Sequence, residues 1–142
     1  MLTKINIHSS VAVYLQIENE VQFAIASGKL KAGDKLPSVK RLAEQLGINF
    51  NTVGKAYRDL EVMGLVYTRR GMGVYIEKGV TASCRARCFE RTAERLHEVV
   101  QEAKAAGLKK GLLTEALTAS FAAKGSPYGY VPKAVLSLAK GK

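Results

Sequence analysis

The chain has 142 residues, of which 47% are hydrophobic and 24% charged, and its 22 basic and 12 acidic side chains give a net charge of +10. This length allows one full domain and an appendage, and no apolar run reaches the roughly 18 residues of a membrane span or forms a signal-peptide core, so we expect a cytoplasmic protein. A basic excess in both halves, 11 against 7 in residues 1–78 and 11 against 5 in residues 79–142, favours a polyanionic partner.

The first predicted element is a helix over residues 9 to 28. Its apolar residues recur at helical spacing, Ser9 and Ser10 are candidates for its N-terminal cap, and Gly28 ends it. The loop that follows, GKLKAGDKLPS, is rich in Gly and Lys, and we expect Leu30 and Leu36 to anchor it to the core.

Two short helices joined by a tight turn come next. Ser38, behind Pro37, can cap the first helix, and Gly47 stands where a left-handed residue ends a helix at least cost. Asn49 can cap the second helix, which Gly64 ends. The apolar faces of the two helices consist of Val39, Leu42, Ala43 and Leu46, and of Val53, Ala56, Tyr57, Leu60 and Met63. This spacing predicts a helix-turn-helix.

The first turns of the second helix carry side chains that can read DNA. Asn51 can pair with adenine, Thr52 can touch a thymine methyl or a phosphate, and Lys55 can serve guanine or the backbone. Phe50 and Gly54 also lie away from the apolar face. Because the N-terminal residues of the second helix meet base edges in a helix-turn-helix, we predict a DNA-reading surface here.

A basic hairpin follows. Leu65 to Tyr67 and Val74 to Ile76 are rich in strand-forming residues and predict two short strands. Arg69 and Arg70 carry charge toward the tip, where Gly71-Met72-Gly73 provides the turn. Such a hairpin can lie along the sugar-phosphate backbone or enter the minor groove, so it is interpreted as a wing.

These elements set the expected organisation, with Gly79 as the boundary. Residues 1–78 are predicted to form a winged helix-turn-helix DNA-binding domain, and residues 79–142 a small all-α dimerisation domain. The fold class is therefore α+β, but mostly α.

Two amphipathic helices are predicted after the boundary. The first runs from Thr81 or Ser83 to Ala106, Gly107 breaks it, and the second ends near Gly125. Two such helices bury too little apolar surface alone, so we expect them to pack against the same pair of a second subunit. The predicted interface residues are Phe89, Leu96, Val99, Val100, Leu112, Leu113, Leu117 and Phe121.

The last segment begins with turn residues and predicts a short helix from Lys133 to Ala139. Two interpretations remain open for its apolar side chains: they pack across a dimer interface, or they belong to a loosely ordered arm. The residues concerned are Tyr128, Tyr130, Val131, Val135 and Leu138.

Cys84 and Cys88 lie four residues apart, on one face of the predicted long helix. Without a nearby His or a CxxC pattern, they are expected to be small apolar fillers. The alternative is that the four thiols of a dimer sense an oxidant or a metal. No nucleophile stands beside a base and no plausible metal set occurs, so we expect no enzyme, no cofactor and no metal site.

The N-terminal half resembles the GntR-type bacterial transcription regulators over GDKLPSVKRLAEQLGINFNTVGKAYRDLEVMGLVYTRRGMGVYI and the preceding YLQIENEVQFAIASGKLKAGDKLPS. The short tail is similar to that of the YtrA subfamily, whose members carry a small helical dimerisation region. The resemblance implies that Lys40 or Arg41, the start of the second helix, and the wing residues hold DNA. Phe50 stands where the family has a small, Pro or basic residue, and Gly54 where a longer side chain is usual. The candidate DNA-binding residues are Ser38, Lys40, Arg41, Asn49, Phe50, Asn51, Thr52, Lys55, Arg69, Arg70 and Gly71.

The sequence therefore predicts a dimeric transcription regulator, expected to be a repressor that binds an inverted-repeat operator on double-stranded DNA. The resemblance further suggests control of its own operon, which often includes a membrane transporter, and leaves a small-molecule effector unassigned. One alternative is an architectural protein that coats duplex DNA without strong sequence preference. Another is a winged domain whose Arg69 and Arg70 bind an acidic protein.

Overall fold

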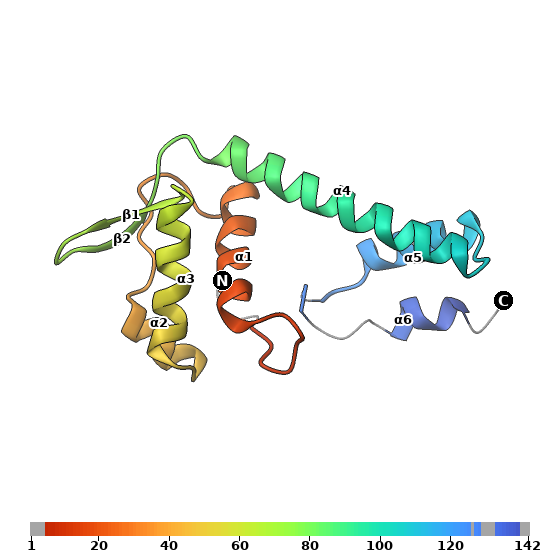
Figure 1. Ribbon diagram of the computed structural model, residues 1–142, viewed down its shortest axis with the longest axis horizontal. Coiled ribbons are helices and arrows are strands. Elements are labelled where there is room, and N and C mark those ends of the chain that lie inside the picture. Colours follow the sequence, from red (N-terminus) through yellow and green to blue (C-terminus); the bar gives the residue numbers. More distant parts are fainter. Residues whose placement is uncertain (1–4, 126, 129–132, 140–142) are drawn as a thin grey trace. The chain divides into compact units, whose positions relative to one another are not determined.

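The computed structural model describes residues 5–125, 127–128 and 133–139 of the chain (Figure 1). The chain divides into two units, Met1–Glu90 and Arg91–Lys142, which we call the N-terminal and the C-terminal unit. The helix α4, Thr81–Ala105, contributes residues to both. In the described residues, no helix is long and apolar enough to cross a membrane.

The N-terminal unit has three helices and a two-stranded sheet. The helices are α1 (Val13–Ala26), α2 (Val39–Leu46) and α3 (Phe50–Val62), and the strands are β1 (Val66–Arg69) and β2 (Gly73–Ile76). α3 packs against both α1 and α2 (Figure 1). This arrangement is the predicted winged helix-turn-helix, so the predicted fold class is confirmed. The core side chains that are at most 2% exposed include Ile17, Val21, Ile25, Leu36, Leu42, Val53, Leu60, Leu65 and Ile76.

Helix α1 begins later than the sequence predicts. Its N-cap is Ala12, which offers no side-chain hydrogen bond, and the Ser9 hydroxyl instead accepts from the amide of Val11 at 3.1 Å. The buried Gln16 side chain holds the preceding segment, because its amide nitrogen donates to the carbonyls of Asn6 and Val11, at 2.8 Å each. The predicted start at residue 9 is therefore wrong: a long-range side-chain contact, which no local pattern reveals, fixes these residues outside the helix.

The helix-turn-helix joint follows the predicted caps. The Ser38 hydroxyl accepts from the amide of Arg41 at 3.1 Å, and the Asn49 side chain accepts from the amide of Asn51 at 2.7 Å. Gly47 takes the left-handed conformation with φ 65°, which ends α2 without the steric cost that a side chain would add. These caps position the first turn of α3.

We call the antiparallel hairpin of β1 and β2 the wing. Arg69 pairs with Gly73 nearest the tip, so β1 extends two residues further than predicted. The loop before α2 continues the sheet: Lys35 forms a β-bridge with Tyr75, and the Leu36 amide donates to the Val74 carbonyl at 2.8 Å. The wing is therefore fastened to the loop as well as to α3.

The same loop closes a ring with the end of the wing. The Ile76 amide donates to the Asp34 carbonyl, and the Gly33 amide donates to the Ile76 carbonyl, both at 2.9 Å. The chain therefore enters and leaves the helix-turn-helix and wing at one place.

The C-terminal unit contains the later part of α4, α5 (Lys110–Ala122), α6 (Lys133–Leu136) and a short 3-10 helix at Ser137–Ala139. Gly107, with φ 73°, separates α4 from α5. The two long helices predicted from periodicity are confirmed, with ends within about three residues. Tyr130 and Val131, for which the sequence left packing across a dimer interface and a loosely ordered arm open, lie outside the described residues.

Candidate nucleic-acid interface

The start of α3 presents polar side chains to solvent. Asn51 is exposed, Thr52 is half-buried and Phe50 is 57% exposed, while Val53 in the same turn is buried in the core. The Asn49 side chain is engaged in capping the helix, so it is a positioning group rather than a free reader. Asn51 and Thr52 thus extend from a helix end that is fixed by its caps and its core contacts.

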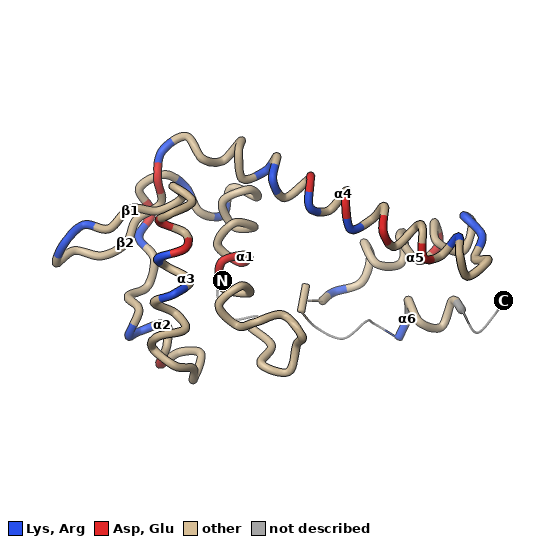
Figure 2. The backbone as a smooth tube through the Cα atoms, in the orientation of Figure 1, with Lys and Arg blue, Asp and Glu red and all other residues tan. Residues whose placement is uncertain are grey.

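Basic side chains flank this helix start on two elements. Lys40 and Arg41 lie exposed in the first turn of α2, and Arg69 and Arg70 lie exposed on the wing. Figure 2 shows these cations at the start of α2 and at the wing tip. Gly71 has φ 75°, which gives the tight turn at the tip. A polar helix start between two cationic elements suits a duplex whose backbone lies on either side of the groove being read.

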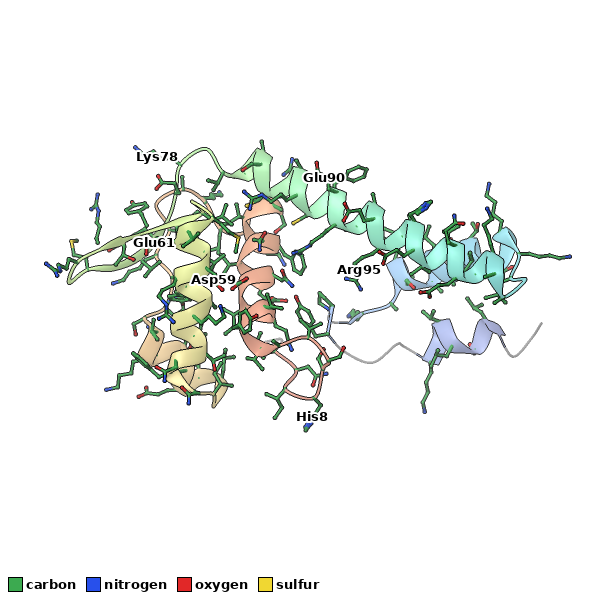
Figure 3. All side chains as sticks on the ribbon, viewed as in Figure 1. His8, Asp59, Glu61, Lys78, Glu90 and Arg95 are labelled. Carbon is green, nitrogen blue, oxygen red and sulfur yellow. The ribbon has the colours of Figure 1, made fainter. Side chains whose placement is uncertain are left out.

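The wing arginines differ in their surroundings. The guanidinium of Arg69 lies 5.9 Å from the ring centroid of Tyr67 and 5.8 Å from that of Tyr75, and the two rings stack at 5.7 Å. Aromatic faces attract a cation without neutralising it, so Arg69 is oriented and remains charged. The wing itself is tied to α3, because the Glu61 carboxylate accepts from the Thr68 amide at 3.2 Å (Figure 3).

Lys55 is held against α1. Its ammonium lies 3.0 Å from the Asp59 carboxylate and 4.5 Å from the centroid of the Tyr14 ring. The hydrogen bond to Asp59 raises the pKa of Lys55. Of the predicted α3 readers, Lys55 is therefore the one engaged within the molecule, and its contact with DNA stays a prediction.

A third charged residue, Glu18 of α1, lies next to Lys55 and Asp59. The sequence did not single it out. It is 5% exposed at the packing of α1 against α3, and it shares a hydrogen bond with Asp59. Burial, and then the neighbouring Asp59, raise the pKa of Glu18 to about 7, while the hydrogen bond from Glu18 lowers the pKa of Asp59. The sequence did contain a sign that Glu18 is buried, because this residue lies next to Ile17 on the apolar stripe of α1. Figure 3 shows Asp59 on the side of α3 that faces α1.

Gly54 lies within α3 and is not among the glycines with a positive φ, so the helix does not need glycine there for its backbone conformation. A Cβ built there would lie 3.2 Å from a guanidinium nitrogen of Arg58, so the Arg58 side chain folds over the glycine. Glycine in place of the longer side chain that is usual in the family therefore leaves space for the Arg58 side chain.

In the C-terminal unit, apolar side chains lie exposed on α4 and α5. Leu96 and Val99 are each 52% exposed, Leu117 is 50% and Phe121 is 86% exposed, while Val100, Leu112 and Leu113 are half-buried. An apolar groove of about 390 Å³ runs between the helices, lined by Leu96, Val100, Leu108, Leu113 and Leu117 with Lys104 at its side. Leu108 belongs to the groove and was missed, because it sits in the turn after Gly107 and outside the helical stripe.

Phe89 and the two cysteines belong to the N-terminal unit. Phe89 is 71% exposed. Cys84 is fully buried in the core, and burial raises the pKa of its thiol, whereas Cys88 is half-buried. A thiol with a raised pKa is a poor nucleophile and metal ligand. Across the described residues, no cluster of three His, Cys, Asp or Glu side chains could hold a metal ion.

Comparisons with known proteins agree with this geometry. Residues 13–76 match the model of "Bacterial regulatory proteins, gntR family". The chain is 35% identical over 114 residues to the HTH-type transcriptional repressor YtrA of Bacillus subtilis, with 80% of this chain and 88% of that protein covered.

Among solved structures, a transcriptional regulator from Oenococcus oeni superimposes with a TM-score of 0.63 and 33% identity, covering 80% of this chain and 94% of that one. A GntR family transcriptional regulator from Listeria monocytogenes gives a TM-score of 0.61 and 31% identity, covering 77% and 95%. The similarity thus extends past the winged unit into the C-terminal helices.

Proposed function

This chain belongs to the GntR family of bacterial regulatory proteins, and from that membership we propose that it is a homodimeric repressor that binds an inverted-repeat operator. The family is one of transcription regulators, not enzymes. The observation that carries the proposal is the exposed Asn51 and half-exposed Thr52 on a capped helix start between two cationic elements. A regulator of bacterial genes works in the cytoplasm, where the DNA lies.

In the proposed complex, the start of α3 enters the major groove. Asn51 and Thr52 read base edges, and Phe50 packs on the groove wall. Lys40 and Arg41 bind the backbone at the start of α2, near the Ser38 cap, and Arg69, Arg70 and Gly71 bring the wing to the backbone or the minor groove. Residues 1–78 therefore carry DNA binding.

Residues 79–142 carry dimerisation in this proposal, and a second copy covers their apolar surface. The groove between α4 and α5 and the exposed Leu96, Val99, Leu117 and Phe121 support it, because a monomer would leave all of this surface in water. Burial contributes about 25 cal/mol per Å² of apolar area, which favours association of matching faces. Two winged units then meet half-sites about one helical turn, or a multiple of it, apart.

Repression is proposed because the similar protein of Bacillus subtilis is named a transcriptional repressor. The proposed operator lies upstream of the chain's own operon, which would include a transporter. A small-molecule effector would act by binding more tightly to a dimer whose two α3 helices are wrongly spaced for the operator.

Selection of bound duplexes from random DNA, followed by footprinting of the region upstream of the gene, tests the proposal. We expect one inverted repeat in both experiments, and an affinity at least about 4 kcal/mol better for the selected duplex than for mixed-sequence DNA. Equal affinity for both, with a steep dependence on salt, would instead identify an architectural DNA-binding protein. If the winged domain serves to bind an acidic protein, replacing Asn51 and Thr52 by Ala would leave binding intact, and loss of operator recognition in that variant would reject this alternative.

A further inference from the structure

Lys35, which the sequence did not single out, is fixed beside the wing by backbone pairing. It forms a β-bridge with Tyr75, and the next residue donates its amide to the Val74 carbonyl. Paired residues of an antiparallel ladder project to the same side, and so do residues two apart on a strand. The Lys35 side chain therefore lies on the face of the wing that carries Tyr75 and Gly73.

The stem of Lys35 occupies the space that a side chain at residue 73 would fill. A Cβ built on Gly73 would lie 2.7 Å from Cε and 3.5 Å from Nζ of Lys35. Gly73 also has φ 129°, a backbone conformation that other residues rarely adopt. Glycine at this position thus lets the lysine lie along the wing with its ammonium near the tip.

Arg69 approaches the same place from the other strand. It is the register partner of Gly73, and its guanidinium is oriented by the rings of Tyr67 and Tyr75. Lys35 and Arg69 both line a cleft of about 370 Å³ between the wing and the start of α2. Ser38 and Thr68 add hydroxyl groups to the lining, and Gly71 and Gly73 leave it open.

Neither Lys35 nor Arg69 forms an ion pair with a carboxylate of the described residues. The ion pair of Lys55 with Asp59 lies elsewhere, on the α1 side of α3. An anion in the cleft would lower the energy of both cations at once. Hydroxyl donors beside a lysine and an arginine suit a phosphate, which takes a point charge from lysine and paired hydrogen bonds from arginine.

We infer that Lys35 and Arg69 together bind one backbone phosphate of duplex DNA in this cleft. The inference rests on the proposed function, since it requires the wing to approach DNA, and it adds to it a contact made by the loop before α2. Such a contact carries no sequence information and fixes the position of the wing on the duplex.

The test compares Lys35→Met with Lys31→Met in the full chain. Methionine keeps most of the stem over Gly73 and removes the charge, and Lys31 is an exposed lysine of the same loop outside the cleft lining. Affinity for a mixed-sequence duplex is measured by fluorescence anisotropy over a series of salt concentrations. We expect the slope of log K against log salt to fall in Lys35→Met by up to about 0.9 for each winged unit, and therefore by up to about 1.8 for the proposed dimer.

Lys31→Met should keep the wild-type slope. An unchanged slope in Lys35→Met, or an equal fall in both variants, would overturn the inference. A purely structural role of Lys35 would lower the thermal stability of the free protein while leaving the slope unchanged, and so would also overturn it.

A double-variant cycle with Arg69→Met tests whether the two cations share one phosphate. Sharing predicts that the fold-loss of the double variant differs from the product of the two single losses by more than about twofold. If the fold-loss of the double variant lies within about twofold of the product of the single losses, the two cations bind separate phosphates and the shared site is overturned.

The failure of the proposed function has a separate readout. Wild-type protein that binds selected and mixed-sequence duplexes equally would reject the sequence-specific repressor, and the Lys35 comparison on mixed-sequence DNA would still stand. If the wild type strongly prefers the selected duplex and Lys35→Met has the same salt slope as the wild type, only the phosphate site is rejected.

Discussion

At the scale of single residues, we expect Glu18 to make the stability of the α1–α3 packing dependent on pH. Burial of its carboxyl beside Asp59 raises the pKa of Glu18 to about 7 from the ordinary value of 4.5 that it has in the unfolded chain. Below about pH 4.5 the group is protonated in both states. Between pH 4.5 and 7 the unfolded chain releases a proton that the folded chain retains, so the free energy of unfolding falls as pH rises through this window.

We expect Glu18→Gln to remove this fall, because glutamine is a neutral side chain of the same size that can still donate to Asp59. The wild type should lose at most about 3 kcal/mol between pH 4.5 and 7.5, at about 1.4 kcal/mol per pKa unit. Urea unfolding at a series of pH values measures it, with the exposed Glu44→Gln as control. A wild type and a Glu18→Gln variant with parallel pH profiles would show that Glu18 ionises normally.

Asn51 is the residue whose loss should affect sequence preference most directly. Asn51→Ala removes the exposed amide and leaves the Asn49 cap, so the fold should keep its stability. We expect about 1–3 kcal/mol less discrimination between the selected duplex and mixed-sequence DNA, the value of one bidentate base contact. Anisotropy titrations measure it. Gln45→Ala on the exposed face of α2 should behave as wild type, and equal effects of both variants would contradict base reading by Asn51.

At the scale of elements, the sequence predicted the caps and the wing because their causes are local. Ser38, Gly47 and Asn49 act within a few residues of themselves, so their pattern in the chain was enough. The late start of α1 could not be predicted, since Gln16 reaches back to Asn6 across ten residues. Lys35 and Glu18 escaped detection for the same reason: the partners that give them a role lie on other elements.

Cys84 fastens the beginning of α4 to the core of the N-terminal unit. The neighbouring Arg85 supports this attachment, because its guanidinium donates to the Ala26 carbonyl at the end of α1, at 2.9 and 3.1 Å. The fully buried Cys84 packs in the apolar core as a small hydrophobic side chain, which is the role that the sequence predicts for it.

We expect Cys84→Ser to destabilise the N-terminal unit by about 1–2 kcal/mol, because a hydroxyl replaces a weakly polar thiol in the core. Cys88→Ser, at a half-buried position, is the matched control and should change stability by less than about 0.5 kcal/mol. Thermal unfolding followed by circular dichroism measures both. If oxidant or zinc released DNA from wild type and not from the double Ser variant, packing would be an incomplete account of these residues.

At the scale of the whole molecule, the proposed dimer depends on the exposed apolar residues of α4 and α5. We expect Leu96→Glu combined with Leu117→Glu to give a monomer, because two charges would enter the proposed interface, where their desolvation has no compensation. Sedimentation velocity measures the assembly state, and footprinting should show a matching loss of the second half-site.

Thr118→Glu is the control for that variant, since it adds charge to the exposed surface of α5 beside, but outside, the groove lining. It should remain dimeric. A wild type that sediments as a monomer at concentrations that saturate the operator would contradict the dimer directly.

The pairing of Gly33 and Asp34 with Ile76 has a consequence for protein engineering. Backbone hydrogen bonds of Gly33 and Asp34 to Ile76 hold the two ends of the segment 33–76 side by side. This segment therefore forms an insert whose ends lie next to each other. Such a piece can be exchanged between related regulators without altering the distance that the rest of the chain must bridge. A chimera that receives it should acquire the donor's operator preference while keeping the recipient's response to its inducer.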